Sequence, residues 1–147
     1  MNRVTSLIKS KLDQDNANAT LLKLCDYVEF LNSESKSGSL VVVEGRKDLK
    51  ALRSIGFEGD VLLFNNFRGI THFVDTMSIR KRKVILLLDM DREGKVLTSK
   101  LLGQMKSRCR HDDLRCKHRL AQITKGRIKH IEELLSFSKR MNPWGYS

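Results

Sequence analysis

Three short runs of aliphatic residues follow one another along the chain. They are LVVV at 40–43, DVLLF at 60–64 and VILLL at 84–88. A short unbroken aliphatic run is typical of a strand that is covered on both faces, as in a parallel sheet. We therefore expect three buried strands that run parallel to one another.

Apolar residues at helical spacing predict a helix after each of these strands. The first helix begins at Arg46 and ends at Gly56, where a glycine cap is expected, and the others cover 70–79 and 94–105. Alternating strands and helices joined by right-handed crossovers build a parallel sheet with helices on both faces. The predicted fold class is therefore α/β, a Rossmann-like parallel sheet flanked by helices on both faces.

The regions before and after this core have weaker patterns. Residues 19–32 predict an amphipathic helix with Leu21, Leu24, Cys25, Val28 and Leu31 on one face, and the polar residues 33–39 predict a linker. Downstream, we expect a fourth strand around 106–112 and a closing helix over 127–141. The expected parts are a helical extension (1–37), a core (38–112) and a basic helical extension packed on the same domain (113–147).

Charge is unevenly distributed along the chain. Its 28 Lys and Arg against 17 Asp and Glu give a net charge of +11, and residues 80–147 contribute 18 of the basic and seven of the acidic residues. Such an excess favours a polyanionic partner, so we expect nucleic acid. No stretch approaches the roughly 20 apolar residues that span a bilayer, and we expect no membrane partner.

The first residues and the cysteines predict the compartment. The segment after Met1 is polar and has no signal-peptide core, which favours a cytoplasmic protein. The three cysteines, Cys25, Cys109 and Cys116, form no even set, so we expect reduced thiols.

Acidic residues follow two of the predicted strands. Glu44 ends the first, and Asp89 and Asp91 end the third in the stretch VILLLDMDREGK. Ligands of open parallel sheets bind at the carboxyl ends of the strands, so these carboxylates share one pocket if the first and third strands are neighbours. Their mutual repulsion in a partly buried place favours a bound cation.

The donor chemistry of this cluster suits Mg²⁺, with Mn²⁺ as a substitute, because carboxylate oxygens are hard ligands. We expect Asp89 and Asp91 to bind the metal directly and Glu93 to complete its shell. Glu44 is expected to act as the general acid or base.

Phosphate contacts are expected around the same acids. The backbone at Gly45 and the amides of the helix that Gly94 opens suit a phosphate group. The basic residues expected to contact nucleic acid are Arg46, Lys47, Arg92, Lys95, Lys106, Arg108, Arg110, Arg115, Lys117, Arg119, Lys125, Arg127 and Lys129.

The motifs VVVEGRKD and VILLLDMDREG together resemble the Toprim domain, which is shared by type IA topoisomerases, bacterial primases, OLD-family nucleases and 5S rRNA maturases. The resemblance covers roughly residues 38 to 110. Glu44 and Gly45 match the Glu-Gly motif, Asp89 and Asp91 match Asp-x-Asp, and Glu93 extends it as in topoisomerases. Asp48 matches an acid of the first motif and is a candidate for acidic support.

Several alternatives stay open for these residues. The acids after the third strand also fit a solvated loop or a haloacid-dehalogenase motif, and Asp48 also fits a helix N-terminus. Arg46 and Lys47 also fit pairing with nearby acids. A second metal site is conceivable in CRHDDLRCKH, where four residues have zinc-binding chemistry: Cys109, His111, Cys116 and His118.

Other side chains have simpler interpretations. His72 and His130 lie in predicted helices and are interpreted as surface or core residues. Trp144 and Tyr146 fit either base stacking or an apolar anchor.

The sequence thus predicts a nucleic-acid-binding Toprim protein with Mg²⁺-dependent, nuclease-like hydrolysis of phosphodiesters. RNA is preferred over DNA by resemblance to the small rRNA maturases. The alternatives are a non-catalytic RNA- or DNA-binding module that docks phosphate on its metal, and nucleotidyl transfer like that of a primase. Oligomeric state and the need for a larger RNA-processing complex stay open.

Overall fold

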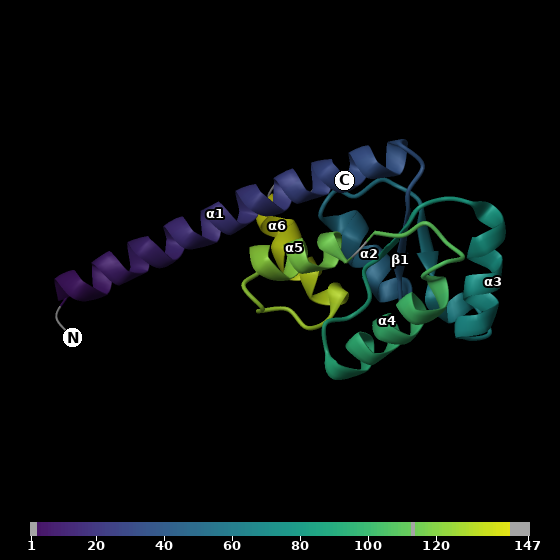
Figure 1. Ribbon diagram of the computed structural model, residues 1–147. Coiled ribbons are helices and arrows are strands. Elements are labelled where there is room, and N and C mark those ends of the chain that lie inside the picture. Colours follow the sequence, from purple (N-terminus) through teal and green to yellow (C-terminus); the bar gives the residue numbers. More distant parts are fainter. Residues whose placement is uncertain (1–2, 113, 142–147) are drawn as a thin grey trace.

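Alternate residues of the strands pack against different helices. The computed structural model (Figure 1) describes residues 3–112 and 114–141. Its sheet has the order β2, β1, β3. In the central strand, Val41 and Val43 pack in one core, while Leu40 and Val42 pack in a second core on the opposite face. The strands are β1 (Leu40–Val43), β2 (Val61–Leu63) and β3 (Val84–Leu86).

Parallel pairing makes the first and third strands neighbours. Val42 pairs with Leu62 of β2 on one side and with Leu86 of β3 on the other. The chain therefore crosses from β2 past β1 to reach β3. The adjacency on which the predicted acidic pocket depends is present.

Helices cover both faces of the sheet, which confirms the predicted α/β class. Tyr27 and Phe57 belong to the core under α1, α2, α5 and η2, and Phe73 and Met77 belong to the core under α3 and α4. The helices are α1 (Arg3–Lys36), α2 (Arg46–Ser54), α3 (Ile70–Arg80), α4 (Arg92–Met105), α5 (Arg115–Ile123) and α6 (Leu135–Met141). The 3₁₀ helices are η1 (Phe64–Asn66) and η2 (Ile131–Leu134).

The first helix is longer than the pattern indicates. The prediction of a helix over 19–32 followed by a linker over 33–39 is wrong at both ends. Helix α1 begins at Arg3 and continues to Lys36, and the chain changes direction only at Gly38, where φ is +105°. The residues after 32 are polar, but they contain no proline or glycine that would end a helix earlier. The buried face contains Tyr27, whereas Cys25, which was expected on it, is exposed.

The amino-terminal half of α1 projects from the rest of the molecule (Figure 1). Four apolar side chains on this projection are exposed, Val4, Leu7, Ile8 and Leu12. Within the part of the chain that the structure describes, no helix combines the length and the apolar composition needed to cross a bilayer.

The structure after Met105 also differs from the prediction. The expected fourth strand is reduced to one parallel bridge between Val84 and His111. Helix α5 was not predicted, because its sequence is rich in basic residues and even its buried face includes a lysine, Lys117. Its apolar residues therefore form no clear helical pattern. The expected helix over 127–141 begins only at 131, where the Glu133 carboxylate accepts hydrogen bonds from the backbone amides of Lys129 and His130.

Candidate metal centre

The predicted acids of the first and third strands meet at the carboxyl edge of the sheet. Glu44 follows the last residue of β1, and Asp89 lies three residues beyond the end of β3. The backbone N–H of Asp89 donates a hydrogen bond to Oε1 of Glu44 over 3.3 Å. Parallel pairing of these two strands therefore brings the predicted general acid or base next to a predicted metal ligand.

Asp91 is the N-cap of α4. Its Oδ1 accepts a hydrogen bond of 2.7 Å from the backbone N–H of Gly94. Gly94 also allows α4 to start close against the strand end, since a Cβ on Gly94 would lie 2.1 Å from the carbonyl oxygen of Asp89. Only glycine therefore fits at this position without moving the helix away from the backbone of Asp89.

A segment from the carboxyl-terminal part of the chain closes the site. Nε2 of His130 lies 3.0 Å from Oδ2 of Asp91, and the N–H of Ile131 donates to Oδ1 of Asp89 over 2.9 Å. The N–H of Met90, between the two aspartates, donates to the carbonyl of Lys129 over 2.6 Å. Three consecutive residues thus hold the Asp-Met-Asp turn in place.

The donor atoms gathered here fit a divalent metal ion. One ligand atom each from Asp89, Asp91 and His130 lies within 4.8 Å of the others, and within the described residues this is the one such group of three or more. Two carboxylates suit Mg²⁺ or Mn²⁺, and an imidazole adds a ligand that Mn²⁺ accepts more readily than Mg²⁺ does. His130 was predicted to lie within a helix as a surface or core residue, but it precedes η2 and its partly exposed side chain lies beside Asp91.

The other predicted acids lie outside this group. Glu93 is exposed on the first turn of α4, beside a hollow that Arg92 and Lys100 also line. Asp48 is buried, and its Oδ2 accepts a hydrogen bond of 3.1 Å from the N–H of Gly45. This bond fits the cap at the start of α2 that was one of the two interpretations of Asp48.

Burial and neighbouring charge change the acid strength of Glu44. Partial burial raises the pKa of this carboxyl, and the negative charge of Asp89 raises it further. Burial likewise raises the pKa of Asp48, against the lowering effect of its hydrogen bond from Gly45. A carboxyl with a raised pKa is closer to the range in which it exchanges protons near neutral pH.

The pKa values of Asp91 and His130 move in opposite directions. The hydrogen bond from Gly94 holds the pKa of Asp91 below its usual value, and His130 contributes in the same direction. Desolvation lowers the pKa of His130, but the hydrogen bond to Asp91 and the nearby acids outweigh it, so that its pKa is raised. In the metal-free protein, the two side chains therefore favour an imidazolium–carboxylate pair.

A buried lysine supports the site from behind. Lys117 is 6% exposed, and its Nζ donates to the carbonyl of Asp89 and to Oγ1 of Thr98, both over 3.1 Å. Desolvation lowers the pKa of this ammonium, while the charge of Asp89 acts against the lowering. The expectation that Lys117 belongs to an exposed basic surface is therefore wrong, although Arg115 and Arg119 on the same helix are exposed.

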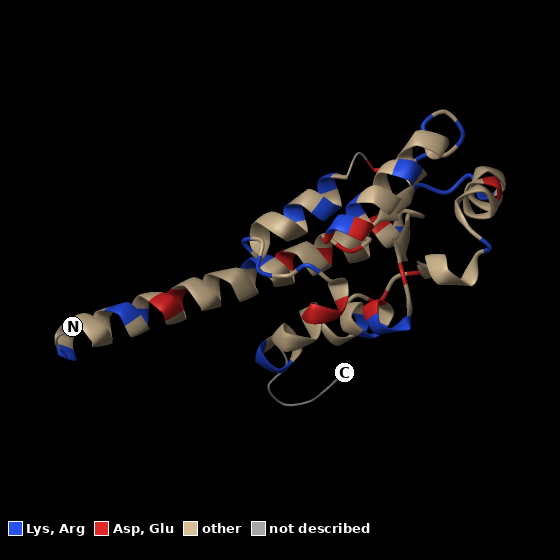
Figure 2. Cartoon of the chain, turned by 90° about the horizontal axis from the view of Figure 1, so that it is seen from below, with Lys and Arg blue, Asp and Glu red and all other residues tan. Residues whose placement is uncertain are grey.

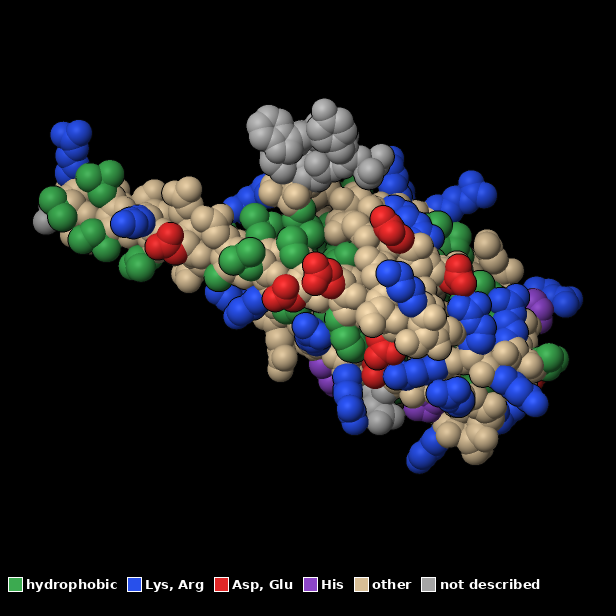
Figure 3. Space-filling view, turned by 90° about the horizontal axis from the view of Figure 1, so that it is seen from above, with side chains coloured by type: hydrophobic (Ala, Val, Ile, Leu, Met, Phe, Trp, Pro, Cys, Tyr) green, Lys and Arg blue, Asp and Glu red, His purple; other side chains and the backbone are tan. Residues whose placement is uncertain are grey.

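The other predicted basic residues lie on the surface. Figure 2 shows that Lys and Arg lie on several helices and loops, and Figure 3 shows many Lys and Arg side chains on the globular part of one face. Two have partners of their own: Arg108 forms a 2.7 Å ion pair with Asp75, and the guanidinium of Arg119 lies over the ring of Phe30. The exposed set is Arg46, Lys47, Arg92, Lys95, Lys106, Arg108, Arg110, Arg115, Arg119, Lys125, Arg127 and Lys129.

The four candidate zinc ligands do not converge. None of Cys109, His111, Cys116 and His118 belongs to a group of metal-binding side chains among the described residues. Cys116 is buried, and desolvation with the nearby Asp112 carboxylate raises the pKa of its thiol to about 12. A thiol with this pKa stays protonated and is a poor metal ligand.

The remaining candidates have separate positions. His72 accepts a hydrogen bond from the N–H of Arg68 through its Nδ1. Trp144 and Tyr146 lie outside the described residues.

Comparison with known proteins adds a family to this geometry. A family model described as "Toprim domain" matches residues 39–132. A UPF0292 protein from Archaeoglobus fulgidus is 30% identical over 115 residues, which cover 78% of this chain and 89% of that protein. A DNA primase DnaG from Aeropyrum pernix is 30% identical over 107 residues, which are 70% of this chain and 25% of the primase.

A solved structure has a similar fold. A protein from Aquifex aeolicus superposes with a TM-score of 0.59 at 28% identity, over 74% of this chain and 94% of its own. The likeness to known proteins thus extends from the sequence to the fold.

Proposed function

This chain belongs to the Toprim domain family, whose function is linked to nucleic acids and divalent metal ions, and on that premise we propose that it hydrolyses phosphodiester bonds in RNA with Mg²⁺. The observation that carries the proposal is the convergence of Glu44, Asp89 and Asp91 at the carboxyl edge of the sheet. Exposed lysine and arginine side chains follow these acids on the first turns of α2 and α4.

The metal would be held by Asp89 and Asp91, with the His130 imidazole beside them. A bound divalent ion polarises phosphoryl oxygens and lowers the pKa of a coordinated water. Asp89 is already oriented for this role, because the N–H of Ile131 fixes one of its oxygens. Glu93 was expected to complete the shell of the metal, and we propose that its exposed carboxylate on the first turn of α4 does so through water.

Glu44 is proposed to move the proton at the reacting oxygen. It is half-buried beside Asp89, and its raised pKa makes the protonated form more accessible near neutral pH than for a free carboxylate. Lys117 acts as a positioning residue in this scheme. Its ammonium holds the backbone of Asp89 and adds positive charge behind the carboxylates.

The exposed basic side chains are proposed to bind the phosphates on either side of the reacting bond. Arg92 and Lys95 are exposed on the first turn of α4, next to the Asp91 cap. Their contacts would carry no sequence information but would fix the register of the strand. Binding is therefore expected to weaken steeply with salt, in proportion to the number of phosphates contacted.

The test uses end-labelled structured RNA, single-stranded RNA and single-stranded DNA with Mg²⁺ or Mn²⁺. The intact chain is compared with Asp89→Asn/Asp91→Asn, and Glu58→Gln serves as a matched control because Glu58 is exposed and lies in the turn before β2. We expect metal-dependent products from RNA with the intact chain and with Glu58→Gln, and none with the double variant.

A second candidate function is suggested by the hydrogen bonds of the aspartates. Each carboxylate accepts a hydrogen bond from a backbone N–H, Asp89 from Ile131 and Asp91 from Gly94. This arrangement would suit a module that docks phosphate on its metal without cleaving it. Metal-dependent RNA binding without products in either ion would select this module over the nuclease. Extension of a strand from nucleoside triphosphates would instead select a primase-like activity.

A further inference from the structure

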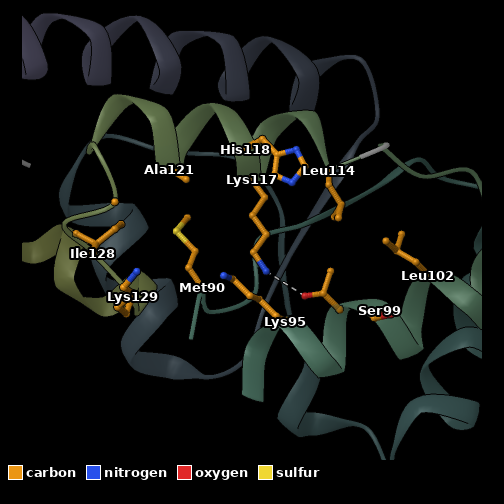
Figure 4. A pocket seen from close by; sticks show the side chains of 12 residues that line it. Met90, Lys95, Ser99, Leu102, Leu114, Lys117, His118, Ala121, Ile128 and Lys129 are labelled. Atoms are coloured by element: carbon orange, nitrogen blue, oxygen red, sulfur yellow. Dashed lines mark hydrogen bonds between the residues drawn. The ribbon is translucent and has the colours of Figure 1, made fainter. Parts of the chain in front are cut away.

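A cavity of about 480 Å³ lies between α4, α5 and the loop that follows α5. Figure 4 shows its side chains coming from both helices and from the loop, with Met90 among them. The volume falls in the range of roughly 300–1,000 Å³ that is usual for small-molecule sites.

The cavity combines an apolar wall with amino groups. Met90, Leu102, Leu114 and Ile128 supply aliphatic surface on its two sides (Figure 4). The side chains of three lysines, Lys95, Lys117 and Lys129, also line it, and the described residues that line it include no Asp or Glu. This composition suits a ligand that has a flat apolar body and a negatively charged group.

The cavity adjoins the metal centre. Met90 stands between the two aspartates in sequence, and Lys117 donates to the carbonyl of Asp89. Lys95 and Lys129 line both the cavity and a neighbouring hollow that Asp91 also lines. An anionic group held by these two lysines would therefore lie next to the carboxylates, with the apolar body inside the cavity.

We propose that this cavity binds one nucleoside phosphate, with the base against the apolar wall and the phosphate on Lys95 and Lys129. The inference rests on the proposed function for the role of the bound nucleotide, but the binding itself needs no metal. The ligand is either a free nucleotide or the unpaired end of a nucleic acid strand, because both present the same base and phosphate. In the second case, the cavity would position a strand end beside Asp89 and Asp91.

The test measures binding by calorimetry in EDTA, so that no metal bridges the ligand to the acids. The probes are AMP, adenosine, inorganic phosphate and a 5′-phosphorylated triadenylate. We expect AMP to bind one to one, and adenosine and phosphate to bind at least about tenfold more weakly, because each lacks half of the complementary surface. Triadenylate binding about tenfold tighter than AMP would identify a strand end, and equal binding would identify a free nucleotide.

Two variants and one control connect this binding to the cavity. Ala121→Trp fills the space, and Lys129→Gln removes an exposed amino group, so the first should abolish AMP binding and the second should weaken it by about tenfold. Lys50→Gln removes a comparable exposed lysine from α2 and should change nothing. Far-UV circular dichroism and Mn²⁺ binding monitor the fold of each variant.

Asp91→Asn separates this inference from the proposed function. It should weaken Mn²⁺ binding and leave AMP binding in EDTA unchanged. Lys129→Gln should instead weaken AMP binding and leave Mn²⁺ binding unchanged. Absence of saturable AMP and triadenylate binding would overturn the inference, and so would binding that Lys129→Gln leaves intact. Neither result would bear on hydrolysis at the metal centre.

Discussion

Two glycines of α4 should respond in opposite directions to the same substitution. Gly94 lies at the start of the helix, where an added Cβ would stand 2.1 Å from the carbonyl oxygen and 2.6 Å from the carbonyl carbon of Asp89. Gly103 lies in the last turn of the same helix, is exposed and has nothing within 4 Å of its added Cβ. Comparing Gly94→Ala with Gly103→Ala therefore separates the steric effect of the close approach of α4 to the strand end from the general preference of a helix for alanine over glycine.

The expected magnitudes follow from this difference. Gly103→Ala should raise the free energy of unfolding by about 0.5–1 kcal/mol, the helix preference of alanine over glycine. Gly94→Ala gains the same preference but forces a backbone shift, and overpacking of this kind costs about 1–3 kcal/mol or more. The two variants should therefore differ by roughly 1–3 kcal/mol, with Gly94→Ala the less stable.

Urea denaturation followed by circular dichroism measures both variants, and Mn²⁺ binding measures the site. The shift at Gly94 displaces the N-cap carboxylate of Asp91, so Gly94→Ala should also weaken Mn²⁺ binding, whereas Gly103→Ala should not. If Gly94→Ala proves as stable as Gly103→Ala and binds Mn²⁺ normally, the steric reasoning about this junction is refuted.

Three further predictions concern titratable groups. Because folding raises the pKa of His130, its contribution to stability is present below its unfolded pKa and is lost as pH rises through the folded value. His130→Gln in EDTA should therefore lower the urea midpoint more near pH 5.5 than near pH 8.5. Equal losses at the two pH values would contradict the pairing of His130 with Asp91. Folding raises the pKa of Asp48 as well, which favours its protonated form, so Asp48→Asn should gain stability relative to the intact chain between about pH 4 and pH 7; a loss would show that its charge is needed. At roughly neutral pH, exposed Cys25 should react rapidly with the thiol reagent DTNB, whereas buried Cys116, with a pKa of about 12, should react slowly. The reaction is followed at 412 nm, and single Cys→Ser variants assign each phase. Fast reaction at Cys116 would show that its helix opens.

The sheet and its acids were predictable because local patterns determine both. The aliphatic run before Asp89 predicts a buried strand, and the acid at its end falls at the carboxyl edge in any parallel sheet. The position of Glu44 beside Asp89 needed one fact more, the adjacency of the first and third strands. A crossover permits that adjacency, and the structure shows it.

His130 and Lys117 could not be predicted in the same way. The His130–Asp91 contact joins residues 39 positions apart, and no local pattern indicates it. Lys117 sits among basic residues that favour a solvated face, yet its ammonium finds two oxygen acceptors inside the protein. A partial signal for the helix start at Ile131 did exist, since Glu133, three residues after His130, supplies the acidic half of a capping box.

The closing segment at Lys129 to Ile131 has a consequence for synthesis on the ribosome. Glu44, Asp89 and Asp91 are made first, and the residues that fix the Asp-Met-Asp turn follow about 40 positions later, a delay of roughly 2–8 s at usual elongation rates. During that interval, the nascent chain has its carboxylates but lacks the hydrogen bonds that orient them. Orientation of the acids therefore belongs to a late step of folding, after the strands have been translated.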